Sequence, residues 1–235
     1  MIYLKVTKIG GFGMNEMEIS PQEYEKMNPF ITIWRHPKKT TRYIIKEKNY
    51  FYIIIFLSLG YIGSTFTGFI DLGSDLDFLP LWALVLFTVI LSPIFGIIGN
   101  AFSALGVWLI GKIFSGKGTY GQMFKAASLS VWPMIMLIPI YLLWMWVDPD
   151  SLFYFSNSDY SFISIIALLF TIAAFIWSIV IYIGAIAEAH QFSNWKSFFT
   201  ILIFLIPLFI IFFIIVFIIF LIMIFLGIAF LSDIV

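Results

Sequence analysis

The sequence predicts an all-α fold, a polytopic membrane helix bundle with five transmembrane helices, the N-terminus cytoplasmic and the C-terminus outside. Of its 235 residues, 62% are hydrophobic and 11% are charged, whereas roughly 25% of an average soluble domain is charged. Mean hydropathy is +1.04. A compact domain of this length still exposes about a quarter to a third of its chain area, so apolar surface must face lipid. This composition argues against a soluble enzyme or a nucleic-acid-binding protein.

The first domain is a cytoplasmic segment, residues 1–48, with interfacial amphipathic helices. It holds nine of the thirteen Lys and Arg residues and lacks the apolar core of a signal peptide. Ser20-Pro21-Gln22-Glu23 fits a capping box, and Asn28-Pro29 is a second helix start. Alternatively, translation begins at Met14, because Ile9-Gly10-Gly11 can be encoded by a ribosome-binding sequence; the protein would then lack residues 1–13.

Residues 29–48 combine an apolar face with positive charge. Spacings of three and four place the apolar residues on one helical face, and five basic residues follow on the next stretch. We expect this segment to lie on the cytoplasmic leaflet and to contact anionic headgroups. The alternative is a solvated linker whose charge only sets topology. The membrane-interface candidates are Phe30, Ile33, Trp34, Arg35, Lys38, Lys39, Arg42 and Lys46.

The second domain, residues 49–235, contains five long apolar runs. A helix needs about 20 residues to cross the hydrocarbon core, and every run reaches that length, whereas the alternating pattern of a β-barrel is absent. The predicted crossings are 50–70, 78–110, 126–147, 161–187 and 197–231.

Charge sets the orientation of these crossings. With the N-terminus inside, all basic residues are cytoplasmic, as the positive-inside rule requires. Splitting 78–110 into two crossings would export three lysines, so this run is one long helix, tilted or kinked at Pro93. In the last run, 197–206 either lies along the interface or spans, with Pro207 starting the crossing in the first case. The two outer loops contain Asp71, Asp75, Asp77, Asp148, Asp150 and Asp159.

Two helices carry stripes of small or polar residues, which allow close helix packing in lipid. The second crossing has Gly96, Gly99, Asn100, Ser103 and Gly106; the fourth has Ser164, Ala167, Thr171, Ala174, Ser178 and Ala185. We expect the two stripes to face each other or another small-residue helix. Asn100 could instead line a polar path, but packing is the favoured interpretation.

Few residues indicate catalysis or metal binding. Cysteine is absent, which removes thiolate sites, and we expect no cofactor and no metal. Gly116-Lys117-Gly118-Thr119 lacks the full phosphate-loop spacing and indicates a Gly-rich turn near headgroups. Glu188 and His190 end the fourth crossing, where a proton or metal site is the alternative to two headgroup-level polar residues. Their two-residue spacing does not share a helix face.

Several short motifs resemble the Yip domain (Ypt- or Rab-interacting) membrane protein family, of the bacterial sort, over residues 28–231. They are Asn28-Pro29-Phe30 through Trp34 with Pro37 and Thr40; Phe95-Gly96-Ile97-Ile98-Gly99; Gly118-Thr119-Tyr120 with Phe124, Ser130 and Pro133; and Gln191-Phe192-Ser193 with Lys196. The resemblance implies a five-helix fold with a cytosolic N-terminus. Eukaryotic members act in vesicle traffic and bind Rab GTPases, but their Asp-Leu-Tyr-Gly-Pro motif is missing from residues 1–48, and Ser128-Leu129 replaces their Gly-Tyr.

The sequence therefore predicts a non-enzymatic multi-pass protein of the cell membrane whose partners include lipids and not nucleic acid. Heavy use of Phe and Ile indicates an AT-rich, bacterial genome. The expected function is a membrane-organising or partner-binding scaffold, with a membrane-protein partner or a second copy bound in the bilayer. The alternative is a permease or efflux component for a small or amphiphilic solute.

Overall fold

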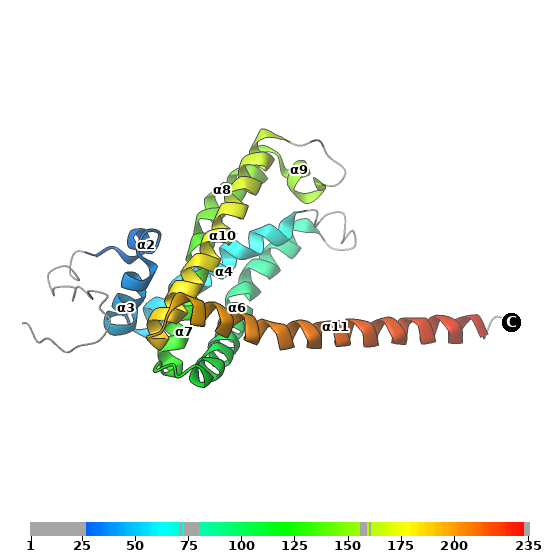
Figure 1. Ribbon diagram of the computed structural model, residues 1–235. Helices are drawn as coiled ribbons and strands as arrows, with labels where there is room; N and C mark the ends of the chain where they lie inside the picture. Colours follow the sequence, from blue (N-terminus) through cyan, green and yellow to red (C-terminus); the bar gives the residue numbers. More distant parts are fainter. Residues whose placement is uncertain (1–26, 71, 73–79, 156–158, 160, 233–235) are drawn as a thin grey trace, which may run out of the picture.

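The computed structural model describes residues 27–70, 72, 80–155, 159 and 161–232, and every regular element among them is a helix (Figure 1). The predicted start at Met14, the capping box at Ser20–Glu23 and the loop residues Asp71, Asp75 and Asp77 lie outside the described residues.

Two short helices precede the membrane. Helix α2, Pro29–Thr32, is capped by the Asn28 side chain, which accepts a hydrogen bond from the Phe30 N–H at 3.1 Å. Helix α3, Pro37–Glu47, again starts with proline at its first position, where the missing N–H costs no hydrogen bond. The start predicted at Asn28-Pro29 is confirmed.

Within the part of the chain that the structure describes, five helical stretches are long and apolar enough to cross a membrane, as predicted. Within the first stretch, a 3-10 turn extends the α-helix; α9, a short helix outside the crossings, follows α8. The elements are α4 (Tyr50–Thr65) with η1 (Phe66–Phe69), α6 (Leu81–Ile113), α7 (Tyr120–Ser128) with η2 (Leu129–Met136) and α8 (Leu137–Val147), α9 (Pro149–Phe153), α10 (Phe162–His190) and α11 (Asn194–Ser232). Helix α6 continues through Pro93 as one long helix, so the unsplit crossing is confirmed.

The third crossing differs from the prediction at its start and in its middle. It begins at Tyr120 instead of residue 126, because Thr119 and Gln122 form a capping box that starts α7. Its middle, η2, is a 3-10 helix around Pro133. Proline has no N–H to donate, and the Ser128 and Ser130 hydroxyls donate to carbonyls three residues earlier. The backbone of η2 is therefore wound more tightly than the α-helices on either side of it.

Helix α4 packs directly against the backbone of η2. A Cβ at Gly60 would lie 2.6 Å from the Val131 carbonyl oxygen, and one at Gly63 would overlap the Met134 carbonyl. Small residues permit this close approach where lipid supplies no hydrophobic drive between helices.

The small-residue stripes of α6 and α10 receive aromatic side chains from other helices. That the two stripes face each other or another small-residue helix stays a prediction. On α6, Gly96 packs against the Tyr61 ring, Gly106 packs against the Phe204 ring, and a Cβ at Gly99 would lie 4.0 Å from the Tyr61 hydroxyl. The polar members of the stripe form hydrogen bonds: Asn100 donates to the Phe124 carbonyl at 3.2 Å, and the Ser103 hydroxyl bonds the Tyr182 hydroxyl at 2.7 Å. On α10, Ala167 and Ala174 lie in a core with Tyr141 and Trp144, and Thr171 bonds Tyr141 at 3.0 Å.

Helix α11 leaves the bundle as a single helix (Figure 1). Ser197 and Thr200 are buried, and Phe204 contacts Gly106, but no described side chain beyond Thr200 is buried. The helix continues through Pro207. Whether 197–206 lies along the interface or spans stays a prediction.

Candidate functional site

Every Lys and Arg that the structure describes lies at one end of the bundle. Helices α3 and α7 and the C-terminal ends of α6 and α10 gather there, and α9 with Asp148 and Asp150 lies at the opposite end (Figure 1). We call this the basic end. The segregation of charge seen in the sequence is therefore also a segregation in space.

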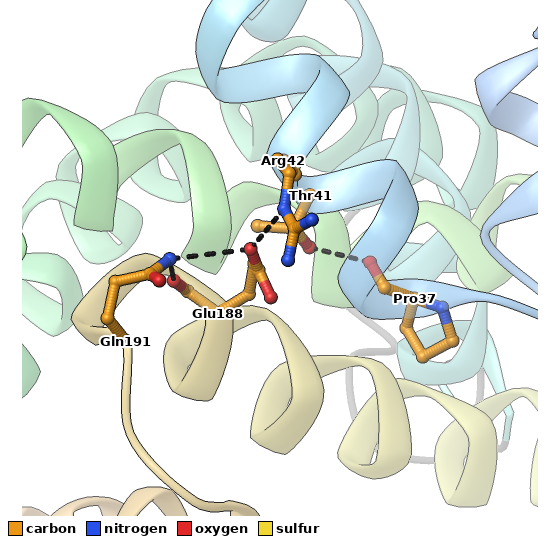
Figure 2. A network of polar contacts seen from close by, with 5 residues as sticks. All are labelled: Pro37, Thr41, Arg42, Glu188 and Gln191. Atoms are coloured by element: carbon orange, nitrogen blue, oxygen red, sulfur yellow. Dashed lines mark hydrogen bonds and ion pairs between the residues drawn. The ribbon is translucent and has the colours of Figure 1, made fainter. Parts of the chain in front are cut away.

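A charged pair joins α3 to α10 at the basic end. The Arg42 Nε–H donates to Glu188 Oε1 at 2.7 Å, and the two side chains are 26% and 8% exposed. Figure 2 shows Gln191 beside the same carboxylate; its Nε2 donates to the Glu188 carbonyl oxygen at 2.6 Å. Removing a carboxylate from water is costly unless a partner satisfies it. Arg42 supplies that partner for Glu188.

Gln191 ends α10 in the left-handed conformation, with φ of 58°. This region disfavours side chains with a Cβ and is more often occupied by glycine or asparagine. The Gln191 N–H bonds the Glu188 carbonyl at 3.2 Å, which closes the helix end. The turn aims the Gln191 side chain back toward Glu188 (Figure 2).

The α6–α7 turn packs closely against the C-terminal end of α10. The Lys117 N–H donates to the His190 carbonyl at 3.0 Å. A Cβ at Gly111 or at Gly116 would overlap the His190 ring, and one at Gly118 would lie 2.6 Å from the Ala189 carbonyl oxygen. These glycines are therefore needed for close approach, and they fix Lys117 at the C-terminal end of α10.

The His190 side chain is buried in this contact between the α6–α7 turn and α10. Its ring is fully buried, its Nε2 lies 3.1 Å from the Val107 carbonyl oxygen, and Phe192 stacks on it at 5.0 Å. Glu188 faces Arg42 instead, so the two-residue spacing separates them as predicted. Among the described residues, no three His, Asp or Glu side chains gather as a metal site.

Lys125 ties α7 to the end of α3. Its ammonium donates to the Ile45 carbonyl at 3.1 Å and to the Lys48 carbonyl. The last carbonyls of a helix lack partners within it and carry partial negative charge. Lys125 therefore stabilises the C-terminus of α3 and holds it at the basic end.

These elements surround a polar cavity of about 240 Å³ between α3, the α6–α7 turn and α10. Three cationic side chains and one carboxylate contribute to its walls, so the lining carries net positive charge. The lining residues are Arg42, Ile45, Lys46, Lys117, Gln122, Glu188, Ala189 and Gln191. Such a lining can bind and orient an anion.

The structure places the predicted membrane-interface residues in three settings. Ile33 has no exposed surface and lies in the protein core, and its predicted place at the headgroup boundary stays a prediction. Phe30 and Trp34 are partly buried against aromatic rings, Phe30 with Phe56 and Trp132, and Trp34 with Trp177 at 6.5 Å. The Trp177 Nε1–H also donates to the Trp34 carbonyl at 3.1 Å. The apolar face of α2 therefore docks on the bundle.

The basic residues of the same segment divide between surface and cavity. Arg35 is exposed, and Lys38 and Lys39 are partly exposed. Arg42 and Lys46 line the cavity. Contact of the exposed residues with anionic lipid stays a prediction. No local pattern in the sequence indicates the Arg42–Glu188 pair; the available clue is that Glu188 is one carboxylate at the predicted cytoplasmic end of an apolar run.

Comparison with known proteins agrees with this architecture. The family model for the Yip1 domain matches residues 31–218, which includes α3, all five crossings except the end of α11, and every residue of the cavity. No curated protein and no solved structure gives a significant match. Because the match covers most of the chain, the protein belongs to the Yip1 domain family of multi-pass membrane proteins.

Proposed function

We propose that the protein is a non-enzymatic membrane-organising scaffold that presents a fixed basic surface to the cytoplasmic leaflet of a bacterial cell membrane. We define the basic surface as Arg35, Lys38 and Lys39. The observation that carries the proposal is the docking of α2 and α3 on the bundle through Ile33, Trp34 and the Arg42–Glu188 pair. A docked segment holds its charges in place before any lipid binds.

Electrostatics supports lipid as the partner of the basic surface. Each Lys or Arg near an anionic leaflet contributes about 1 kcal/mol, and the attraction decays within a Debye length of about 8 Å. Three such residues on a rigid support bind without the entropic cost of ordering a flexible segment. Exposed Ile31 beside them adds apolar contact at headgroup depth.

The polar groups of the spans support a scaffold over a permease. Asn100, Ser103 and Thr171 each bond to a protein group, which accounts for them by packing. Cavities beside the spans have mainly apolar walls, among them one lined by Trp82, Val85 and Met145. Transport of a polar solute requires polar groups along a path.

The proposed scaffold also contacts a protein partner through α11. Beyond Phe204, no described side chain of α11 is buried in the chain. A scaffold can use such a helix to contact a membrane-protein partner or a second copy in the bilayer.

Lipid clustering tests the proposed function. The full chain is reconstituted in vesicles containing a fluorescent phosphatidylglycerol, and self-quenching reports local enrichment of that lipid. We expect quenching with the natural chain and a loss of it after Arg35→Gln, Lys38→Gln and Lys39→Gln together. The control exchanges Arg35→Lys, Lys38→Arg and Lys39→Arg, which keeps the charges. Equal quenching by the neutralised and the natural chain would contradict the proposal.

A further inference from the structure

The cavity at the basic end is separate from the basic surface on α2 and α3, and its walls come from three parts of the chain. Helix α3 contributes Arg42 and Lys46, the α6–α7 turn contributes Lys117, and α10 contributes Glu188. With three positive charges and one negative charge, the lining has a net charge of two positive. An anionic ligand is therefore favoured.

The backbone that carries the cationic side chains is fixed by packing rather than left to flexible loops. The Arg42 guanidinium is bonded to Glu188 at 2.7 Å. Lys117 sits between two glycines that pack on His190 and Ala189, and its own N–H bonds the His190 carbonyl. Lys125 anchors the end of α3, next to Lys46. The cavity is thus built before a ligand arrives, which lowers the cost of binding.

Helix α7 adds further donors on the same side. The Gln122 side-chain oxygen accepts the Thr119 N–H at 2.9 Å, so the NH₂ end of Gln122 is the end available to a ligand. The N-terminus of α7 carries partial positive charge. A ligand rich in acceptor oxygens therefore meets donors from Arg42, Lys117 and Gln122.

We propose that this cavity binds a phosphate group, with Arg42, Lys46 and Lys117 as its cationic contacts and Gln122 as a neutral donor. Arginine and lysine form strong charge-assisted hydrogen bonds to phosphate oxygens. Glu188 acts as a positioning residue that orients Arg42. The proposal rests on the proposed function for its membrane setting, and it adds a defined site to the general attraction of the basic surface.

The phosphate can come from a lipid headgroup or from solution. Exposed apolar side chains at the same end, Ile113 at 78% and Trp195 at 73%, place this end at the level of the bilayer surface. A headgroup phosphate would then reach the cavity at its own depth. Free phosphate would reach it from the cytoplasm.

Binding is measured on the full chain purified in mild detergent. Native mass spectrometry with phosphatidylglycerol reports retained lipid, and calorimetry with inorganic phosphate reports the soluble source. The variant carries Lys46→Gln and Lys117→Gln; both side chains are exposed, so their replacement removes no buried contact. The matched control carries Lys112→Gln and Lys196→Gln, two exposed lysines of the same end that are outside the cavity lining.

We expect affinity to fall about fivefold for each cavity lysine removed and to be unchanged in the control. Lipid retention that inorganic phosphate does not displace identifies a headgroup site, whereas calorimetric binding of phosphate identifies a soluble ligand; both support the proposal. Equal binding of both ligands by the cavity variant and the control would overturn it. Neutralising Arg35, Lys38 and Lys39 should leave cavity binding intact, so failure of lipid clustering and failure of the cavity are separate results.

Discussion

Glu188→Gln tests whether the Arg42–Glu188 pair fastens α3 to the membrane bundle. The substitution keeps the size of the side chain and removes its charge, so Arg42 loses its counter-ion. Figure 2 shows that the pair bridges two elements, and the partners are 146 residues apart in the chain. The loss should therefore loosen α3 locally as well as lower the free energy of unfolding.

The burial of the two side chains sets the magnitude. Removing one partner of a fully buried pair costs about 3–5 kcal/mol, and an exposed pair contributes about 0–1 kcal/mol. Arg42 is 26% exposed and Glu188 is 8% exposed. Between these limits, we expect Glu188→Gln to lower the free energy of unfolding by about 2 kcal/mol.

A double-mutant cycle isolates the pair. Arg42→Gln, Glu188→Gln and the double variant are unfolded by denaturant in mild detergent, and trypsin cleavage after Lys38 and Lys39 reports release of α3. We expect a coupling energy of about 1–2 kcal/mol and faster cleavage in both single variants. Lys112→Gln is the control for loss of charge at the same end. Additive single effects with unchanged cleavage would show that the pair does not fasten α3 to the bundle.

Three other predictions concern the α6–α7 turn, the contact between α4 and η2, and α11. Gly116→Ala should destabilise the protein by about 1–3 kcal/mol, because its Cβ would overlap the His190 ring. Gly68→Ala, with nothing within 4 Å of its Cβ, should be neutral or slightly stabilising. Thermal unfolding compares the two variants, and equal effects would contradict the close contact of the turn with His190. Gly63→Ala should cost more than Gly99→Ala, because Gly63 meets the Met134 backbone while Gly99 has only the Tyr61 hydroxyl at 4.0 Å; the reverse order in the same assay would contradict the packing. Helix α11 has 39 residues, about 58 Å at 1.5 Å per residue, so it is longer than a hydrocarbon core of about 30 Å. A fluorophore attached to Phe217→Cys should therefore be quenched by deep-lying lipid labels, and one attached to Phe198→Cys by headgroup labels. Equal depth of the two fluorophores would favour a helix that spans from residue 197.

The helices and their number could be predicted because lipid imposes a simple rule. A crossing needs about 20 apolar residues with all backbone groups bonded within the helix, and composition reveals such runs directly. The same rule explains the error at the third crossing. Gln122 and Lys125 interrupt the apolar run, so hydropathy delayed the start to residue 126, although the capping pattern of Thr119 and Gln122 was available in the sequence.

The partners of individual residues could not be predicted in the same way. Small residues such as Gly96 and Gly106 mark places of close approach, but the sequence does not say that Tyr61 and Phe204 fill them. The cavity depends on contacts between α3, the α6–α7 turn and α10. Distant charges such as Arg42 and Glu188 carry no periodic signal that would pair them.

We infer that the basic end, with its docked helices and its cavity, faces the cytoplasm. The natural chain has no cysteine, so single cysteines introduced by Lys117→Cys and Asp150→Cys report the two ends of the bundle separately. Both side chains are exposed. In intact cells, an impermeant thiol reagent should label the Asp150→Cys protein and should label the Lys117→Cys protein only after the membrane is opened. Labelling of the Lys117→Cys protein in intact cells, with protection of the Asp150→Cys protein, would contradict the account.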